Sequence, residues 1–379
     1  MKSPPGEPRT KTVGHREIPD GRAAAREEML EPLREACRLV AFSGGPIVVA
    51  VSGGADSVGL LHAMVHGDVL PSVAPGRRRP IIVAHAEHDL REDAPLDREF
   101  TAAVARDMGL EFVSRRIACR DVARETGEGI EAAARRLRYA FLVEAAGAAG
   151  ARAVVVAHSA DDQAETILHA ILRGTGLAGL AGMPVVRELA EGIALARPML
   201  GILRSVVRGY LAACGQAWRD DLTNADETFA RNFLRHAILP SLVEGPYPAA
   251  VASIRRLGRQ AAGIAGAVAA AADLLLDDHS RREADGSIVI DPRRLARLDR
   301  HLLGELFVQL WKREGWPRRD MTARHYLRLA DLIGGQGTAR PIDLPDGIRC
   351  RTSPEGRVIV GPVQVVVAPV QSPRISTRR

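Results

Sequence analysis

The residues best suited to chemistry follow a short apolar run. Residues 47–57 read Ile-Val-Val-Ala-Val-Ser-Gly-Gly-Ala-Asp-Ser. An apolar, β-branched run is typical of a buried parallel strand. Two glycines after it let the backbone turn tightly and approach a ligand, and the two serines offer hydroxyl groups beside the free N–H groups of a helix start. The segment predicts a phosphate-binding loop. Its expected phosphate-binding residues are Ser52, Gly53, Gly54, Ala55, Asp56 and Ser57.

Asp56 separates this loop from a Walker A loop. No Gly-Lys pair occurs anywhere in the chain, so the phosphate-gripping lysine of P-loop kinases and GTPases is missing. An acidic residue beside phosphates indicates Mg²⁺ instead. The bland alternative is an ordinary glycine-rich turn between a strand and a helix.

A second cluster is acidic. Residues 157–166 read Ala-His-Ser-Ala-Asp-Asp-Gln-Ala-Glu-Thr and follow an apolar run. Acidic residues at a helix start commonly cap it and oppose its dipole, which accounts for one aspartate but not for three carboxylates. Glu165 lies four residues after Asp161 and three after Asp162, so it shares a helix face with either. Such a group is able to hold Mg²⁺ or to receive a cationic substrate.

Three further segments carry imidazole or guanidinium groups. Residues 85–91 contain two histidines and three charges at the end of an apolar run, with a solvated loop as the alternative. Arg135 and Arg138 lie at i, i+3 on one predicted helix face, where they form either a phosphate clamp or a solvated basic face. Arg231 and Arg235 lie at i, i+4 near aromatic residues, a pattern that suits an RNA backbone contact beside base stacking.

The elements that must position these residues alternate. Strands are expected at 47–51, 81–85, 110–117 and 153–157, and helices at 22–42, 58–65, 94–108, 131–149 and 161–172. This alternation predicts an α/β fold with a doubly wound parallel sheet. Ligands bind such sheets at the carboxyl ends of the strands, so the turns after Val51, Ala84 and Ala157 are expected at one edge.

The composition changes from about residue 248. Helices are expected at 254–279, 295–313 and 322–332, followed by short strands within 340–367. The predicted divisions are a disordered extension over 1–20, a catalytic domain over 21–245, a small helical domain over 246–335 and a short β-rich tail over 336–379.

Composition bounds the class of protein. The chain has 379 residues, 46% of them hydrophobic, and a net charge of +6 that permits nucleic-acid binding. Its four cysteines lie far apart without a CxxC pair, which argues against a zinc ribbon, an iron–sulfur site or a disulfide framework. The N-terminus lacks an apolar signal region and we expect no run of membrane-span length, so a cytoplasmic protein without a membrane partner is expected.

The motifs stand in one order over about residues 45–245. They are Ser52–Ser57, His85–Arg91, Glu131–Tyr139, Ala157–Thr166 with Arg173–Gly176, Asp221–Asn224 and Arg231–Pro240. In this order they resemble the tRNA(Ile)-lysidine synthetase family of PP-loop ATP pyrophosphatases. The first motif is shared by many PP-loop enzymes, whereas the later ones in this order are much more specific.

The resemblance implies a sheet of the PP-loop, or adenine nucleotide alpha hydrolase-like, type. It also implies an enzyme that ligates free L-lysine to C2 of the cytidine at the first anticodon position of tRNA(Ile) with a CAU anticodon. ATP, with Mg²⁺, would adenylate the base and release pyrophosphate, and the lysine ε-amine would then displace AMP. The helical domain would bind tRNA, and a homodimer is left open.

The resemblance and the side-chain chemistry together assign candidate roles. The expected catalytic residues are Asp56, His158, Asp162, Glu165 and Arg138, with Glu165 as the candidate to receive the lysine amine. His85 joins the ATP-binding loop. Asp56 and Asp161 are the expected metal ligands, although the division of the carboxylates between metal and lysine is left open. The expected tRNA-binding residues are Arg135, Arg173, Arg231, Asn232 and Arg235.

Three positions depart from the family pattern. Glu87 and Asp89 replace a small polar residue and a glycine, and aspartate is among the few other residues that tolerate a positive φ. Ser159 replaces a second histidine. The alternative functions are tRNA thiolation, which normally needs catalytic cysteines, amidation of a small molecule, and nucleotide-dependent regulation without catalysis.

Overall fold

The computed structural model describes residues 21–40, 42, 44–72, 78–89, 93–219, 230–336 and 340–363. The expected disordered extension and the Asp221–Asn224 motif lie outside these residues. The chain divides into two compact units, Met1–Arg259 and Gln260–Arg379. The boundaries at 245/246 and 335/336 stay predictions.

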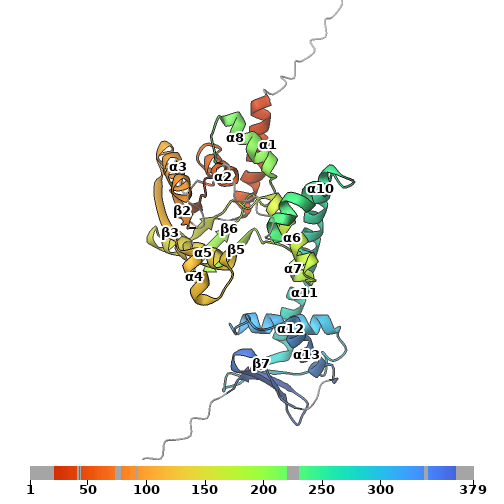
Figure 1. Ribbon diagram of the computed structural model, residues 1–379. Coiled ribbons are helices and arrows are strands. Elements are labelled where there is room, and N and C mark those ends of the chain that lie inside the picture. Colours follow the sequence, from red (N-terminus) through yellow and green to blue (C-terminus); the bar gives the residue numbers. More distant parts are fainter. Residues whose placement is uncertain are drawn as a thin grey trace, which may run out of the picture. The chain divides into compact units, whose positions relative to one another are not determined.

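The first unit is built on a six-stranded sheet (Figure 1). Its strands, in spatial order, are β3 (Glu111–Ile117), β2 (Ile81–His88), β1 (Ile47–Ala50), β4 (Ala153–Val155), β6 (Ile193–Ala196) and β5 (Val186–Ala190). All neighbouring pairs are parallel except the β5–β6 hairpin. The predicted parallel sheet of the PP-loop type is therefore confirmed.

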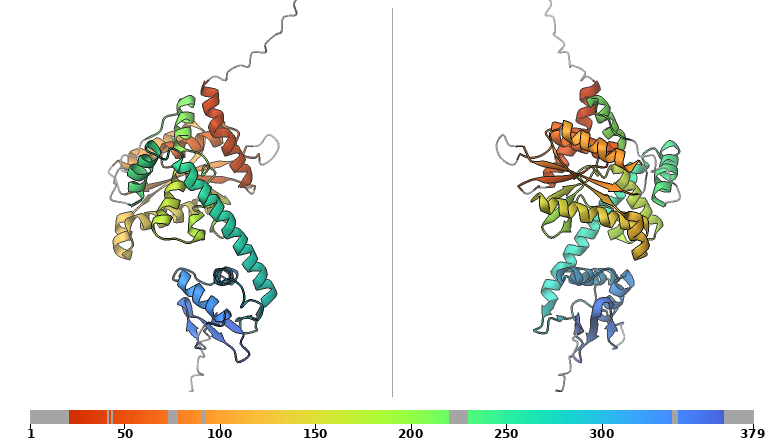
Figure 2. Two further views of the ribbon diagram at one scale, coloured as in Figure 1. Left: turned by 90° about the vertical axis from the view of Figure 1, so that its right-hand side faces the viewer. Right: turned by 60° about the vertical axis from the view of Figure 1, so that its left-hand side comes forward.

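Helices cover both faces of this sheet, and Figure 2 shows α5 on one side and the N-terminal helices on the other. The helices of this unit are α1 (Gly21–Leu39), α2 (Ala55–His66), α3 (Ala94–Asp107), α4 (Cys119–Thr126), α5 (Ile130–Ala148), α6 (Ala160–Leu172), α7 (Leu177–Leu180), α8 (Arg204–Cys214), α9 (Ala230–Phe233), the π-helix η2 (Leu234–Ile238) and α10 (Leu239–Glu244). Side chains alternate along β1: Val49 joins the core under α1, α2 and α8, whereas Val48 joins the core under α5.

The strand order places the motifs together. The chain runs from β1 outward to β2 and β3, and then returns to the opposite side of β1 as β4. The carboxyl ends of β1 and β4 therefore flank a topological switch point, where open α/β sheets bind ligands. The loop after β1 and the acidic segment after β4 meet at this point.

Two details differ from the sequence expectations. β2 continues to His88, so Glu87 belongs to a strand that pairs with β3 and not to a loop. The β5–β6 hairpin was not predicted, because its alternation is short and its only turn signal is Gly192, with φ +70°.

The second unit has its own core. The long helix α11 (Ala250–His279) reaches into it, and the remaining elements are β7 (Ser280–Arg282), β8 (Ile288–Ile290), α12 (Arg300–Arg313), α13 (Ala323–Ile333), β9 (Ile342–Asp343), the 3₁₀ turn η3 (Pro345–Gly347), β10 (Ile348–Thr352) and β11 (Val358–Pro362). The helices and an antiparallel sheet of order β7-β8-β11-β10-β9 share one apolar cluster. α12 begins five residues later than predicted, because the Asp299 side chain caps it by accepting from the N–H of His301 at 2.8 Å.

By length and composition, α11 is the one helix among the described residues that would suffice to cross a membrane. Its most apolar window has a mean hydropathy of 1.3 and is 17% buried. The sequence expectation concerned an uninterrupted apolar run, and in this helix Gln260 and Asp273 limit that run to residues 261–272. Core helices of soluble proteins meet the same criterion, so the observation alone is weak evidence for a membrane span.

Candidate active site

The loop after β1 is held by its own two serines. The backbone N–H of Ser52 donates to Ser57 Oγ at 3.1 Å, and Ser57 Oγ–H donates to the carbonyl of Gly54 at 3.0 Å. No side chain caps α2, whose N-cap is Gly54. The first N–H groups of this 12-residue helix, with their positive dipole end, therefore remain available to an anion.

Gly53 is required by the shape of the loop. Its φ is +94°, and an added Cβ would lie 3.3 Å from Thr101 Oγ1. The loop is also held from outside: the N–H of Arg219 donates to the Gly53 carbonyl at 3.0 Å, and Arg219 Nε donates to Asp97 at 2.5 Å. This brace was not predicted, because Arg219 lies more than 160 residues away in the sequence.

His85 lies beneath the loop. Its Nδ1 is 2.8 Å from the carbonyl oxygen of Val51, and its side chain is buried. Burial lowers the pKa of this imidazole, so the neutral ring donates from Nδ1 to the carbonyl. His85 thus fixes the end of β1, where the phosphate-binding loop begins.

The acidic segment after β4 begins a helix. Ser159, buried, is the N-cap of α6: its Oγ accepts from the N–H of Asp162, and Asp162 Oδ2 accepts from the N–H of Ser159 at 2.8 Å. This reciprocal capping box explains why a serine serves at a position where the family pattern has histidine. One Asp162 oxygen is used in the cap, and the other is turned toward arginine side chains.

Arg204, the first residue of α8, was missed by the sequence reasoning and organises the carboxylates. Its guanidinium donates to Asp56 at 3.2 Å, to Asp162 at 2.5 Å and to Glu165 at 2.9 Å. Its backbone N–H donates to Asp161 at 2.9 Å. Burial alone would lower the pKa of Arg204, but Asp162, Glu165 and Asp56 outweigh burial and raise it.

Glu165 is the most enclosed of these carboxylates. It is 0% exposed and accepts from Arg235 Nε at 2.8 Å as well as from Arg204. Arg231 Nε lies 3.9 Å from it, and Arg231 Nη2 donates to Thr166 at 2.8 Å. Arg231 and Arg235, expected at the RNA, therefore bond in this structure to the acidic segment.

Asp56 carries an unfavourable charge. Burial raises its pKa from 3.8 to about 6, assisted by the negative charges of Asp162 and Asp161 and opposed by Arg204. Asp162 and Glu165 each pair with both Arg204 and Arg235, whereas among the described residues Asp56 pairs with Arg204 alone.

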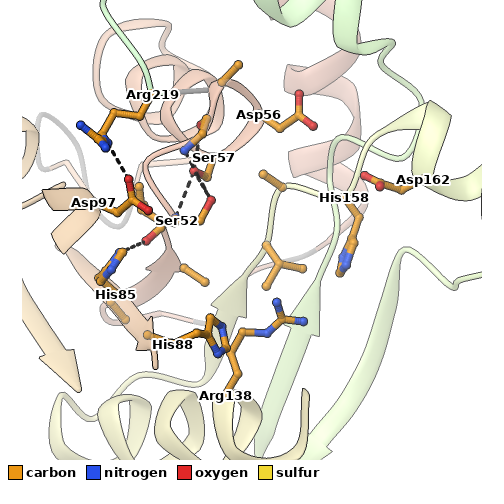
Figure 3. A pocket seen from close by; sticks show the side chains of 18 of the residues that line it. Ser52, Asp56, Ser57, His85, His88, Asp97, Arg138, His158, Asp162 and Arg219 are labelled. Carbon is orange, nitrogen blue, oxygen red and sulfur yellow. Dashed lines mark hydrogen bonds and ion pairs between the residues drawn. The ribbon is translucent and has the colours of Figure 1, made fainter. Parts of the chain in front are cut away.

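A cavity of about 760 Å³ joins these parts, and Figure 3 shows its labelled side chains. Ser52, Ser57 and the Arg219–Asp97 pair lie in one region, Asp56 and Asp162 in another, and Arg138 with His88 across from them. His158 also lines the cavity; burial lowers its pKa to about 3. Its imidazole is therefore neutral near pH 7.

The other candidate residues do not line the cavity. Arg173 is exposed at the far end of α6, about 17 Å along the helix from Asp162. Arg135 is exposed on α5, and Asn232 is half-buried in α9. Asp89 does not need a positive φ: its Oδ1 accepts from the N–H of Cys119 at 2.8 Å and so caps α4.

The fold and the loop define the class of protein. A family model described as a PP-loop domain matches residues 22–242. A solved structure, the U34-tRNA thiolase NcsA from Methanococcus maripaludis with its [4Fe-4S] cluster, is similar with a TM-score of 0.50 and 12% identity, over 62% of this chain and 79% of that one. At this identity the likeness concerns the fold alone.

Curated relatives specify the family. A tRNA(Ile)-lysidine synthase of Thermus thermophilus is 39% identical over 248 residues, 65% of this chain and 43% of the relative. One of Rhodopirellula baltica is 33% identical over 325 residues, 78% of this chain and 81% of the relative. The chain belongs to the tRNA(Ile)-lysidine synthase family. It spans less than half the length of the Thermus relative.

Proposed function

We propose that the protein ligates free L-lysine to C2 of the cytidine at the first anticodon position of tRNA(Ile) with a CAU anticodon, using ATP. The observation that carries this proposal is one cavity in which a phosphate-binding loop and a cluster of carboxylates meet arginine and histidine side chains. Membership of the tRNA(Ile)-lysidine synthase family supports the choice of substrates. The reaction requires tRNA and free lysine, which places it in the cytoplasm.

ATP occupies the loop after β1. The N–H groups that begin α2 and the hydroxyls of Ser52 and Ser57 hold its phosphates, and His85 keeps the loop in position. The C2 carbonyl oxygen of the cytidine attacks the α-phosphate, pyrophosphate leaves, and an adenylated tRNA remains. Arg138 and neutral His158 donate hydrogen bonds to the charge that develops there.

Mg²⁺ fits the acidic edge of this site. No group of three or more His, Cys, Asp or Glu side chains among the described residues is arranged to enclose a metal. Mg²⁺ with a nucleotide needs only one or two carboxylates, since phosphates and water complete its shell. Asp56 and Asp161 would hold it, and among the described residues Asp56 pairs with a single arginine, Arg204. The ion would offset charge on the departing pyrophosphate.

Lysine belongs beside Asp162. The sequence reasoning placed the amine at Glu165, but Glu165 is fully buried under arginine side chains, whereas Asp162 lines the cavity. An Asp162 oxygen that holds the Arg204 guanidinium at 2.5 Å has the charge and position to hold an ammonium group. Glu165 would keep Arg204 and Arg235 in place. The ε-amine must lose its proton before it attacks C2. Burial opposes the shift, but Arg204, the Ser159 N–H and Arg235 lower the pKa of Asp162, so its proposed role is to hold the ammonium group and not to accept the proton.

The tRNA contacts are proposed for Arg231, Asn232, Arg235, Arg135 and Arg173. Arg231 and Arg235 have 32% and 22% of their side chains exposed, so each guanidinium bonds to the acidic segment and still reaches solvent. The target base must be unstacked to enter the cavity, as is possible in an anticodon loop.

Thiolation is the second candidate because the similar NcsA structure is a tRNA thiolase that carries a [4Fe-4S] cluster. The cysteines argue against it here. Cys37, Cys119 and Cys350 are buried, Cys214 is half-buried, and none of the four lines the cavity. A sulfur-carrying thiolate would have to reach the activated base.

Incorporation of labelled lysine into tRNA transcripts tests the proposal. We expect incorporation to require ATP and a CAU transcript, and to fail with a matched transcript that carries guanosine at the first anticodon position. Sulfur incorporation, or ATP cleavage driven by a small molecule without tRNA, would overturn the proposal.

A further inference from the structure

Four arginine side chains surround one phenol ring beside the cavity. The guanidinium carbons of Arg135, Arg138 and Arg187 lie 5.1, 5.4 and 5.3 Å from the centroid of the Tyr139 ring. The fourth arginine, Arg197, follows β6 directly and lies close enough to lower the pKa of the Tyr139 hydroxyl together with Arg135 and Arg138, against the opposing effect of burial. We call these five residues the arginine–tyrosine cluster.

The cluster lacks an acidic partner. None of its four arginines forms an ion pair with a carboxylate in the part of the chain that the structure describes, whereas Arg204 and Arg235 nearby each pair with two or more. Arg187 and Arg197 donate to the backbone carbonyls of Glu188 and Pro184. An aromatic face attracts one cation, but four like charges around one ring repel each other.

Buried polar atoms in the cluster also lack partners. Arg197 is 2% exposed, yet its Nε has no hydrogen-bond partner among the described residues; the Tyr139 hydroxyl, in a residue 9% exposed, has only arginine side chains beside it and no acceptor. The nearby His158 Nδ1 is also buried without a hydrogen-bond partner among the described residues. Such orphaned donors are rare and costly in native proteins, and they indicate a ligand that completes them.

The cluster lies at the ligand-binding edge of the sheet. Arg197 leaves the carboxyl end of β6, His158 follows β4, and both Arg138 and His158 line the cavity. β6 is two strands away from β1, about 10 Å. Arg197 therefore lies apart from the loop after β1, and an anion beside Arg197 is held by different side chains from those of that loop. Arg135 is exposed and Arg187 is half-buried, so the cluster also opens toward solvent.

We propose that the arginine–tyrosine cluster is a second anion subsite, which binds a phosphate oxyanion, that of the RNA backbone next to the target nucleotide. This inference rests on the proposed function for its ligand, but its charge and geometry stand on their own. The other source of the same chemistry is the phosphate of the nucleotide substrate or of AMP. Arginine forks suit both, because they donate two parallel hydrogen bonds to phosphate oxygens.

Binding by the full-length chain tests this inference. Arg187→Gln and Arg135→Gln remove one guanidinium each from partly solvent-accessible positions, so the core is kept. The matched control is Arg115→Gln, because Arg115 also lies over an aromatic ring, that of Phe141 at 5.2 Å, but pairs with Glu144. The probes are a labelled anticodon stem-loop RNA with a CAU anticodon, titrated over a salt series, and ATP and AMP titrated separately.

We expect each cluster variant to bind the RNA roughly tenfold more weakly. The magnitude of the slope of log K against log salt should fall by about one, which corresponds to one lost phosphate contact. The Arg115→Gln variant should bind the RNA as the wild type does. Weakening of ATP or AMP binding instead would support the anion subsite and assign it to the nucleotide phosphate. If both cluster variants bind all probes as Arg115→Gln does, the inference is overturned.

The proposed function and the anion subsite are refuted by different results. Wild-type protein that binds the stem-loop RNA but incorporates no lysine refutes the function and leaves the subsite intact. Wild-type protein that incorporates lysine, with cluster variants indistinguishable from the control, refutes the subsite and leaves the function intact.

Discussion

Replacing Asp56 with asparagine should stabilise the protein while abolishing its activity. Asp56 is only 25% exposed, and its pKa is about 6 in the folded chain against 3.8 for the free side chain. A folded-state pKa above the unfolded value means that the folded protein binds the extra proton. Stability is therefore lost as the pH rises from 3.8 through 6, and the full loss is present above that window.

The magnitude follows from the two pKa values. The difference between 6 and 3.8, at about 1.36 kcal/mol for each pH unit, corresponds to about 3 kcal/mol. Asparagine keeps the shape of the side chain without the charge. The Asp56→Asn variant should therefore gain up to about 3 kcal/mol in free energy of unfolding at pH 8, and almost nothing near pH 4.

Urea unfolding at both pH values, in EDTA and without nucleotide, measures this gain. The matched control is Asp121→Asn. Asp121 is 66% exposed and forms only a long ion pair, 3.7 Å, with Arg124. Because exposed pairs contribute little, this variant should change the free energy of unfolding by less than about 0.5 kcal/mol. An Asp56→Asn variant that is less stable than the wild type at pH 8 would refute the reasoning, since Asp56 would then be a structural partner of Arg204.

Three further substitutions separate the roles of the acidic segment. Glu165→Gln should lower the free energy of unfolding by about 3 kcal/mol, because Arg204 and Arg235 lose the more buried of the two counterions that they share and keep Asp162; a stable variant with only a raised KM for lysine would return the amine to Glu165. Asp162→Asn should raise the KM for lysine roughly ten- to hundredfold while tRNA-dependent pyrophosphate release continues; loss of pyrophosphate release with an unchanged KM would place Asp162 at the ATP. Arg231→Ala should weaken tRNA binding and reduce its salt slope by about one, with ATP binding unchanged; an unchanged slope would remove Arg231 from the RNA.

The sequence was sufficient to predict the four strands β1 to β4 of the first sheet and the turns that bear the motifs. The run 47–51 and the three expected strands after it correspond to β1, β2, β3 and β4, because buried parallel strands leave an uninterrupted apolar signal. The second unit was harder to predict. Its sheet combines β8 with β11 across about seventy residues, and strands of three residues carry almost no periodicity.

The motif residues that line the cavity were predictable from the sequence, but the arginine side chains that pair with them were not. The segment Ser52–Ser57 and the acidic segment are recognisable from the spacing of neighbouring residues. Arg204 stands alone in the sequence, and it meets Asp56 148 residues away only because α8 begins at the same sheet edge. Arg197 likewise depends on a hairpin that the sequence did not reveal. Long-range pairing of single arginines leaves no local pattern.

Single-turnover analysis without lysine tests the central claim most directly. In the proposed reaction, one cavity activates the RNA base first and accepts lysine second. With enzyme in excess, labelled ATP and CAU transcript, we predict pyrophosphate release and an adenylated tRNA that lysine then discharges to AMP. Pyrophosphate release that needs lysine but not tRNA, with no label on the RNA, would contradict the account, because the amino acid would then be the activated group.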